Sequence, residues 1–545
     1  MEILVIGNGL AGLSATIEGA KKGAKVTLVS QNSMDRSQSV MAEGGINAAL
    51  NTKGEEDSTA IHMDETLTSA CGLTSEQGVR DMTAAAPDII KYLSQIGVVF
   101  SRDEQGREDL RAFGGQSKRR TVYSKSGIGR QIVTAMSQEV RKYAAQGHIH
   151  MKEHHRFAEL LIDGEECLGA IVQDIHTGRY EVLVADATIM ATGGMNGLFG
   201  ETTGSYLSDG IATATAFRQG VEMANLEMIQ YHPTTVLRGE KRLLISEAAR
   251  GEGGRLFVYK SDLSDESHNG REKWYFMEEL YPEKGNLMSR DVVSQTMESV
   301  SKQYGQVYLD LTHIPKQILE INLKEVCDTC RTYLQIEPSK DYIPVSPGIH
   351  YFMGGFYVDE SHRCSVKGLY AAGECACQYH GANRLGGNST LGAIYGGMKS
   401  VNTVLSDLWH LQEGVEDAFK AADIKRNRLR FAETQLDHVQ QDGEKILKEN
   451  QKKRVQNILK KGLGIVRDNE TLVTCLEQLK AINAVEQDNM ILLAEAMLKS
   501  ALERKETRGA HVREDYPDKD DANFLKMTVV SYSDNGNVRI RLEDI

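Results

Sequence analysis

Residues 2–30 read EILVIGNGLAGLSATIEGAKKGAKVTLVS, and this stretch decides the fold at the start of the chain. The apolar run Glu2–Ile6 has the composition of a buried strand, and the residues after it predict a tight turn, a helix and a second strand. Gly7, Gly9 and Gly12 fit GxGxxG at the turn, where backbone N–H groups and the helix N-terminus can hold a pyrophosphate. The stretch therefore predicts a doubly wound α/β domain that binds a dinucleotide.

The second predicted strand lacks the acidic residue that standard NAD sites use to bind the ribose hydroxyls. It ends in Leu28, Val29, Ser30 and Gln31. Ser30 can still accept hydrogen bonds from the ribose, but this strand end does not favour a standard NAD site. Because GxGxxG also occurs as a plain strand-to-helix turn, other motifs must identify the cofactor.

Length and composition limit the class of protein. The chain has 545 residues, of which 41% are hydrophobic and 26% charged, so we expect three or four folded units rather than a disordered or fibrous protein. A net charge of -13 argues against nonspecific binding to nucleic acid or anionic lipid. Eight scattered cysteines, no N-terminal targeting pattern and no apolar run of membrane-spanning length predict a cytoplasmic protein that contacts membranes only through partner subunits.

The rest of the chain changes character several times. A second strand followed by glycine occurs at Ala187–Gly194, whereas the region 235–342 is less regular and has the character of an inserted unit. Residues 418–501 are rich in Lys, Glu, Gln and Leu with few Gly and no Pro, which predicts a helical domain with a solvated charged face. The alternating run at the end of the chain predicts a hairpin that turns at Asp534 and Asn535.

Eight further motifs occur in one order along the chain: DRSQSVMAEGGINAAL, RAFGGQS, MIQYHPT, SEAARGEGG, SRDVV, HYFMGG, HGANRLGGNS and RGAHVREDYP. With these motifs the chain resembles the flavoprotein subunits of succinate dehydrogenase and fumarate reductase, from Met1 to about Lys526. The resemblance implies an α/β fold in which a Rossmann-type FAD-binding domain is interrupted by an α+β capping domain and followed by a helical domain. We expect the two parts of the FAD-binding domain at 1–234 and 343–408, the capping domain at 235–342, the helical domain at 409–506 and a C-terminal tail at 507–545.

The resemblance also implies which residues bind FAD. They are Gly7, Gly9, Leu10, Ala11 and Gly12 at the pyrophosphate, Ser30 and Gln31 near the adenosine ribose, Ser37, Gln38, Gly44, Gly45 and Asp209 along the flavin, Glu374 at the ribityl chain, and Arg384, Ser389 and Leu391 beside the ring.

Gln38 departs from the pattern of the covalently flavinylated members. In those proteins the motif around the ring reads SHT and its His is bonded to a flavin methyl group, whereas here Gln38 lies between Ser37 and Ser39. An amide cannot form that bond, so we expect noncovalent FAD. The family comparison then implies a lower flavin potential, which favours the reduction of fumarate over the oxidation of succinate.

Reducing an activated alkene requires a hydride at one carbon, a proton at the next, and positive groups that hold the carboxylates. The flavin would supply the hydride. By resemblance, the groups that bind a small dicarboxylate are His232, Ser246, His350, Arg384 and Phe113. A guanidinium can grip one carboxylate through two hydrogen bonds while imidazoles donate to the other.

Arg290 would be the proton donor by the same resemblance. This choice is unusual, because a guanidinium has a pKa above about 12 and general acids are normally His or carboxylic acids. It requires a relay through Glu247 and Arg250 that returns the proton. These two residues are three apart, so they fall on one side of a helical turn, where a plain intrahelical ion pair is the other interpretation.

L-aspartate oxidase is the close relative that competes with this interpretation. That enzyme typically has a Glu in an REGGHS segment that can pair with the substrate ammonium, whereas this chain has Phe113 there. A phenyl ring cannot neutralise an ammonium but can pack on the apolar middle of fumarate. Lys118, Arg119 and Arg120, which follow, are more similar to the oxidase, so the segment is mixed.

Two hypotheses of other classes remain open from the sequence. The chain could bind flavin without turnover, although keeping all of the predicted substrate residues argues against this. Cys327 and Cys330 form a CxxC pair that could belong to an NAD(P)H-dependent disulfide or quinone reductase, but a single pair lacks the other ligands of a zinc site. No metal site is predicted. Since no haem or iron–sulfur motif is present, electrons must come from another donor, and an iron–sulfur subunit is the partner that the resemblance implies.

Overall fold

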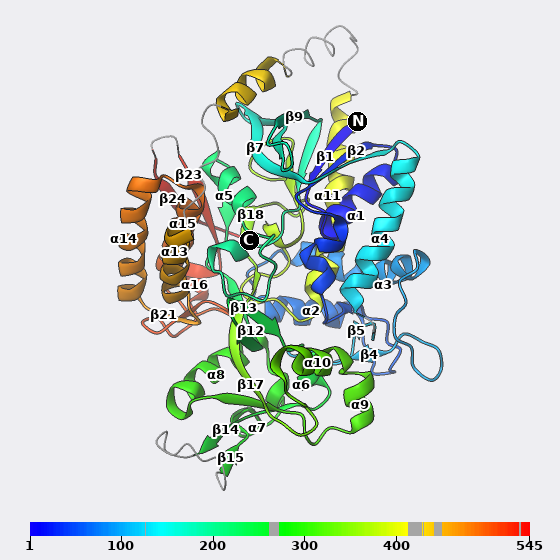
Figure 1. Ribbon diagram of the computed structural model, residues 1–545, viewed down its shortest axis with the longest axis vertical. Coiled ribbons are helices and arrows are strands. Elements are labelled where there is room, and N and C mark those ends of the chain that lie inside the picture. Colours follow the sequence, from blue (N-terminus) through cyan, green and yellow to red (C-terminus); the bar gives the residue numbers. More distant parts are fainter. Residues whose placement is uncertain (126, 261–271, 413–427, 429, 441–448, 534–535) are drawn as a thin grey trace.

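The structure is a computed structural model of the chain, and it describes residues 1–125, 127–260, 272–412, 428, 430–440, 449–533 and 536–545 (Figure 1). A parallel sheet of five strands, in the order β19-β10-β1-β2-β6, forms the centre of the N-terminal part. Its strands are β1 (Glu2–Ile6), β2 (Lys25–Ser30), β6 (Ile149–Glu153), β10 (Ala187–Met190) and β19 (Leu369–Ala371). The strand, turn, helix and strand predicted for residues 2–30 are therefore present.

Three helices pack together beside this sheet, as Figure 1 shows in dark blue, cyan and yellow. They are α1 (Leu10–Lys21), α4 (Ile128–Ala145) and α11 (Asn388–Gln412). Nearly all of α1 is buried, because its apolar and small residues face the sheet on one side and α11 on the other. Since α11 lies late in the sequence, the part of the chain expected to bind FAD, called the FAD-binding part below, is assembled from two segments far apart in the chain.

Several smaller elements surround this layer. The antiparallel sheet β7-β8-β9 follows β6, and the helices α2 and α3 precede α4. Ser58 and Ser75 accept hydrogen bonds from backbone N–H groups at the starts of α2 and α3. The bounds are α2 (Thr59–Ser69), α3 (Glu76–Gln95), β3 (Ile46–Asn47), β4 (Leu110–Arg111), β5 (Thr121–Val122), β7 (His155–Asp163), β8 (Glu166–Asp174), β9 (Tyr180–Val184) and α5 (Ile211–Arg218).

The capping unit is a six-stranded sheet in the order β13-β12-β17-β16-β14-β15, with short helices around it (lower part of Figure 1). Its own apolar core contains side chains from most of these elements. The bounds are β12 (Ile229–Arg238), β13 (Lys241–Leu244), α6 (Ala248–Gly251), β14 (Arg255–Lys260), β15 (Glu272–Trp274), α7 (Phe276–Leu280), α8 (Arg290–Tyr304), β16 (Val307–Asp310), α9 (Lys316–Ile321), α10 (Lys324–Thr329) and β17 (Ile343–Phe352).

Two strands connect the capping unit to the FAD-binding part. β12 pairs with β17 in antiparallel register, from Ile229 opposite Phe352 to Thr235 opposite Ser346. The predicted boundary between 234 and 235 falls inside β12, and the one between 342 and 343 falls at the start of β17. Because residues of both strands line the site described below, the connection is part of the site.

The C-terminal part contains helices α13 (Glu449–Gly462), α14 (Asn469–Glu486) and α15 (Asn489–Glu503), with a further helical stretch at 430–440. Asp468 and Asp488 accept hydrogen bonds from N–H groups at the starts of α14 and α15. Short elements follow: β21 (Val466–Arg467) pairs with β22 (Val512–Arg513), and α16 spans Asp521–Phe524. Helices α13, α14 and α15 share one apolar core with the FAD-binding part.

The last two strands, β23 (Met527–Tyr532) and β24 (Val538–Glu543), form the predicted hairpin. Its predicted turn residues, Asp534 and Asn535, lie outside the described residues. The hairpin extends a sheet in the order β20-β18-β11-β23-β24, whose other strands are β11 (Met223–Ala224), β18 (Gly355–Tyr357) and β20 (Ala376–Cys377). The end of the chain is thus bound to strands near the capping unit.

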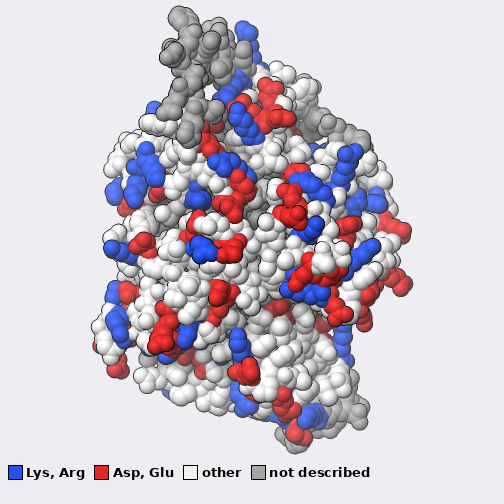
Figure 2. Space-filling view, turned by 180° about the vertical axis from the view of Figure 1, so that it is seen from behind, with Lys and Arg blue, Asp and Glu red and all other residues white. Residues whose placement is uncertain are grey.

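Two surface properties bear on possible partners. On the face shown in Figure 2, acidic and basic side chains of the described residues are intermingled. Within the described part of the chain, no helix is both long and apolar enough to cross a membrane.

Candidate active site

A cavity of about 930 Å³ extends from the turn between β1 and α1 to the helices of the capping unit. This volume lies in the range of sites for cofactors and small ligands. Most of the residues that the sequence assigns to FAD or substrate line it. The exceptions are Gly12, Leu391 and Arg250, which lie behind the wall.

The glycine turn forms one end of the cavity. Gly7 has φ +113°, and a Cβ there would lie 2.1 Å from the Ala191 carbonyl oxygen. A Cβ on Gly12 would lie 1.8 Å from the Gly7 carbonyl oxygen, so this glycine allows the helix to pack against the strand rather than touching a ligand. Helix α1 starts after Gly9, which has no side chain to cap it, and Ser39 accepts a hydrogen bond from the Leu10 N–H alone, so this helix start can still direct other N–H groups to an anion.

The adenosine end predicted from the sequence lies beside this turn. Ser30 and Gln31 line the cavity, and the Ser30 hydroxyl donates to the Asn32 carbonyl oxygen at 2.8 Å. His155 and Phe157 from β7 also line it. No pattern in the sequence marks His155 or Phe157, because β7 lies far along the chain and carries no family motif.

Two buried hydroxyls in the wall lack hydrogen-bond partners within the described residues. They are Ser37 Oγ and Thr192 Oγ1, and both residues line the cavity. Buried polar atoms are normally paired, so unpaired hydroxyls facing a cavity indicate a polar ligand. Together with the glycine turn and the N-terminus of α1, they fit the polar chain of FAD.

Gln38 lies where covalently flavinylated relatives have His. Its side-chain oxygen accepts a hydrogen bond from the Ser205 backbone N–H at 2.5 Å. Ser39 accepts one from the Leu10 N–H at 3.0 Å, so the loop is anchored directly to the start of α1. The Gln38 side chain is therefore part of the hydrogen-bonded wall.

Two carboxyl groups line the predicted flavin region. Glu374 accepts a hydrogen bond from the Phe352 N–H at 3.2 Å, and burial raises its pKa to about 7. Asp209 accepts one from the Ile211 N–H at 3.0 Å, and burial raises its pKa as well. Gly44, Gly45 and Ser389 also form part of the wall, whereas the Leu391 side chain packs in the apolar core.

The predicted proton relay forms one buried cluster at the capping side. Arg290 donates from Nε and Nη2 to Glu247 Oε2, at 2.9 and 2.7 Å. Arg250 donates from Nη2 to Glu247 Oε1 at 3.1 Å and from Nη1 to the Asn286 carbonyl oxygen at 2.6 Å. Burial opposes ionisation of Glu247, but the two guanidinium groups hold its pKa below its ordinary value. Glu247 therefore bridges the two arginines as a carboxylate.

The two predicted histidines lie against each other, with ring centroids 5.0 Å apart. Burial, reinforced by the charge of Arg290, lowers the pKa of both His232 and His350 well below the ordinary value, so both rings are neutral. The Thr203 hydroxyl lies 2.7 Å from His350 Nδ1. If Thr203 donates this hydrogen bond, His350 carries its proton on Nε2 and can donate it to a ligand.

Arg384 is a buried cation with no anionic partner among the described residues. Its guanidinium lies 4.2 Å from the centroid of the Tyr351 ring, and its Nε has no hydrogen-bond acceptor there. Burial, together with the nearby charge of Arg290, lowers the pKa of Arg384 to about 9. Because a buried unpaired charge is costly, the site is built for an anionic ligand.

Phe113 and Ser246 complete this end of the cavity. The Phe113 ring is 1% exposed and lies close to the backbone of Gly44 and Gly386. The next residue, Gly114, donates its N–H to Glu247 Oε1 at 3.0 Å. One loop thus supplies both an apolar wall and a hydrogen bond to the predicted relay.

Comparison with known proteins identifies the family of this chain. A family model described as "FAD binding domain" matches residues 2–390, and one described as "Fumarate reductase flavoprotein C-term" matches residues 480–545. The succinate dehydrogenase flavoprotein subunit of Bacillus subtilis is 35% identical over 562 residues, which cover 97% of this chain and 94% of that protein. The chain belongs to the succinate dehydrogenase and fumarate reductase flavoprotein family.

Other members of this family give the same result. The fumarate reductase flavoprotein subunit of Mycobacterium tuberculosis is 32% identical, with 99% of this chain and 96% of that protein covered. The solved quinol fumarate reductase flavoprotein of E. coli is 27% identical with a TM-score of 0.85, over 100% of this chain and 97% of that chain. The predicted family, fold class and FAD cofactor are therefore confirmed, and the protein is an oxidoreductase. An L-aspartate oxidase of Streptomyces coelicolor is also similar, at 29% identity over 100% of this chain and 93% of that protein.

Sequence reasoning on this flavoprotein missed Gln230. Its side-chain oxygen accepts from Arg290 Nη1 at 3.0 Å, and its amide nitrogen donates to the Arg384 carbonyl oxygen at 2.7 Å. A signal was available, since Gln230 lies two residues before His232 in MIQYHPT, and alternate residues of a strand point the same way.

The CxxC pair has no place in the site. Cys327 and Cys330 are both buried in the core of the capping unit and do not line the cavity. Burial raises their pKa values to about 11 and about 12, so both stay protonated near neutral pH. This environment does not favour a disulfide reductase. Within the described residues, no group of three or more His, Cys, Asp or Glu side chains could hold a metal ion.

Proposed function

We propose that this flavoprotein interconverts fumarate and succinate with noncovalent FAD, and that it acts mainly as a fumarate reductase. The unpaired buried Arg384, beside two neutral histidines and the Arg290 cluster, is the observation that carries the proposal. A dicarboxylate would satisfy the charge of Arg384 and the hydrogen-bond donors around it. The following steps assign roles to the residues of the chain.

Arg384 binds one carboxylate of the substrate by donating two hydrogen bonds from its guanidinium group, as arginine does in bidentate carboxylate pairs. His232 and His350 act as neutral donors to carboxylate oxygens, and the Ser246 hydroxyl adds a further donor. Neutral donors suit this position because Arg290 and Arg384 already supply positive charge. Phe113 excludes water from the apolar middle of the substrate.

Bound FAD supplies the hydride that one alkene carbon must receive. Arg290 delivers the proton to the other carbon. Three of its five N–H groups are used by Glu247 and Gln230, so two are left for the substrate. Glu247 and Arg250, hydrogen-bonded in series behind it, would pass a proton taken up from solvent back to Arg290 after each turnover.

The L-aspartate oxidase alternative lacks support from the cavity wall. Arg120, in the segment that is more similar to the oxidase, is fully buried and pairs with Asp57 and Glu65. Neither it nor Lys118 or Arg119 lines the cavity. Phe113 does line it, and it provides no charge for a substrate ammonium group.

Phe113→Glu is expected to raise the fumarate KM by at least about tenfold, because it places a like charge against the substrate. Phe113→Leu is the matched control, since it keeps an apolar wall and should change KM far less. Steady-state kinetics of the two FAD-loaded variants test this. Equal fumarate KM values for Phe113→Glu and the unchanged protein would remove Phe113 from the substrate site.

Acid precipitation of the purified protein is expected to release all of its FAD into the supernatant. Gln38 lies at the position of the bonding His, and an amide cannot form the flavin bond. The measurement compares flavin absorbance in the supernatant and in the redissolved precipitate. Flavin that stays with the precipitated chain would contradict noncovalent binding.

We further propose an iron–sulfur subunit as the electron donor. Several similar proteins are named as flavoprotein subunits, and the solved E. coli relative is a quinol fumarate reductase. An association with a membrane would then arise through such partners. Purification of the tagged protein from its own cells, followed by iron analysis of what copurifies, tests this.

The proposed direction can be tested with artificial dyes and the purified FAD-loaded protein. Reoxidation of a reduced viologen by fumarate should be much faster than reduction of an oxidised dye by succinate at the same pH. The reverse ratio would support a succinate dehydrogenase. Activity with neither substrate would reject the proposal.

A further inference from the structure

The C-terminal segment passes directly behind the backbone that carries Arg384. Ala510 donates its N–H to the Ala382 carbonyl oxygen at 2.9 Å, and Ala382 donates its own N–H to the Ala70 carbonyl oxygen at 3.0 Å. Ala382, two residues before Arg384, is therefore held from two sides. On one side is the end of α2, and on the other is the turn Arg508–His511.

The same turn also contributes to the apolar cluster that contains the ring on which Arg384 lies. Ala382 and Ala510 belong to a small buried apolar cluster that also contains Tyr351. The Arg384 guanidinium lies 4.2 Å from the centroid of the Tyr351 ring. A shift of the turn would thus move both the backbone of Arg384 and the surface beneath its side chain.

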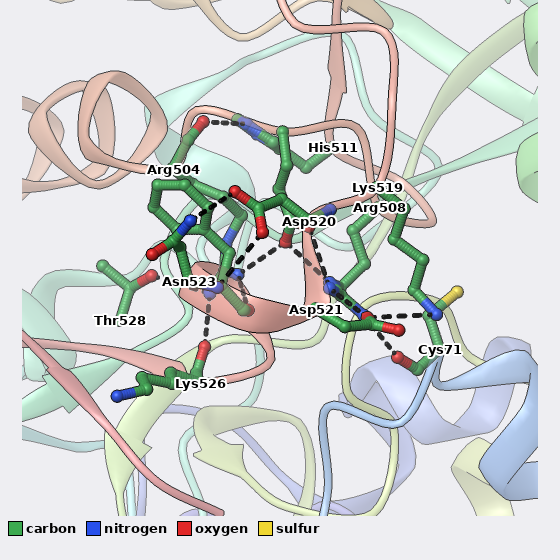
Figure 3. Close-up of polar contacts among 12 residues, drawn as sticks. Cys71, Arg504, Arg508, His511, Lys519, Asp520, Asp521, Asn523, Lys526 and Thr528 are labelled. Carbon is green, nitrogen blue, oxygen red and sulfur yellow. Dashed lines mark hydrogen bonds and ion pairs between the residues drawn. The ribbon is translucent and has the colours of Figure 1, made fainter.

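A buried ionic network fixes the turn itself, as Figure 3 shows. Arg508 donates to both oxygens of Glu506, at 2.6 and 2.8 Å, and to the Cys71 carbonyl oxygen at 3.0 Å. Arg504 pairs with Glu506 at 3.0 Å and with Glu227 at 2.7 Å. These four side chains are 0% exposed, so the charges have no water to replace a lost partner.

Gly509 lies against the Arg384 segment with no room for a side chain. It has φ +56°, and a Cβ there would lie 2.6 Å from the Ala382 carbonyl oxygen and 2.9 Å from Ala382 Cβ. Both contacts are shorter than side chains tolerate, and one of them is with backbone, so the Ala382 segment would have to move.

We infer that the turn Arg508–His511 is a positioning element of the substrate site, which holds the Ala382–Arg384 segment so that Arg384 can bind a carboxylate. This inference rests on the proposed dicarboxylate function. The C-terminal turn acts through Arg384 and does not touch the substrate. A disturbance of the turn therefore affects dicarboxylate binding more than turnover of bound substrate or binding of FAD.

Gly509→Ala in the FAD-loaded protein tests this. The probe is malonate, a dicarboxylate without a double bond to reduce, and its binding is followed through the visible absorbance of the flavin. We expect the malonate Kd and the fumarate KM to rise by at least about tenfold, and kcat to fall by less than about threefold. The FAD content should stay unchanged.

Gly164→Ala is the matched control. Gly164 has φ +60°, close to that of Gly509, but a Cβ there would meet no atom within 4 Å. The two substitutions therefore carry similar backbone strain, and only one of them pushes on the Arg384 segment. An equal change in malonate affinity in both variants, or no change in Gly509→Ala, would overturn the inference.

Arg508→Lys covers the case in which Gly509→Ala does not retain FAD. It keeps the charge but loses the fork that binds Glu506 and the Cys71 carbonyl oxygen. We expect a smaller rise in malonate Kd in the same direction, and unchanged affinity would count against the inference. Failure of the unchanged protein to bind malonate would instead contradict the proposed function.

Discussion

Arg290→Gln is expected to lower fumarate reduction by about 10²- to 10⁴-fold while FAD remains bound, because a glutamine amide cannot deliver a proton. Arg290 is hydrogen-bonded to Glu247 and Gln230 at the capping end of the cavity. Glu247 keeps Arg250 as a partner in the variant, so the cluster retains one compensating charge. Fumarate turnover with a reduced dye and the flavin spectrum measure the two effects separately.

Lys302→Gln is the matched control for this variant. Lys302 lies on the same helix, and its exposed ion pair with Glu298 is remote from the cavity. Exposed pairs contribute little, so activity should be unchanged. Substantial fumarate turnover by Arg290→Gln would remove Arg290 from the role of proton donor.

Arg384→Met should lower kcat/KM for fumarate by about 30- to 4,000-fold, since truncating one member of a buried charge pair costs about 2–5 kcal/mol. Methionine fills a similar volume and removes a cation that has no anionic partner among the described residues, so the fold should tolerate it.

Arg384→Lys should fall between the unchanged protein and Arg384→Met, because an ammonium keeps the charge but not the two-pronged geometry. Malonate binding, followed through the flavin absorbance, checks that the loss is one of affinity. Unchanged fumarate KM in Arg384→Met would show that another group binds the carboxylate.

The first strand, turn and helix are predictable because local geometry dictates them. Gly7 must adopt positive φ, and Gly12 must let α1 approach the strand, so the residue types reveal the turn. The domain boundaries are less predictable. β12 runs through position 234 because strand pairing with β17 continues across the change in sequence character.

The candidate substrate site is predictable only in part, from the motifs that mark it. Arg290, Glu247 and Arg384 stand in motifs, and the structure brings them to one end of one cavity. Gln230 also stands in a motif, two residues before His232, but its role depends on Arg290 and Arg384, which lie 60 and 154 residues away. The motif RGAHVREDYP marks the C-terminal turn, but its contact with the Arg384 segment cannot be predicted from it, because Ala510 and Ala382 lie in distant segments.

The most direct test of dicarboxylate chemistry follows the flavin of the purified protein without any partner. The protein is reduced anaerobically with one equivalent of dithionite, and then fumarate is added while the visible absorbance is recorded. We predict rapid reoxidation of the flavin by fumarate and no reduction of the oxidised protein by L-aspartate. Reduction of the flavin by L-aspartate, with no response to fumarate, would contradict the proposal and identify an aspartate-oxidising enzyme.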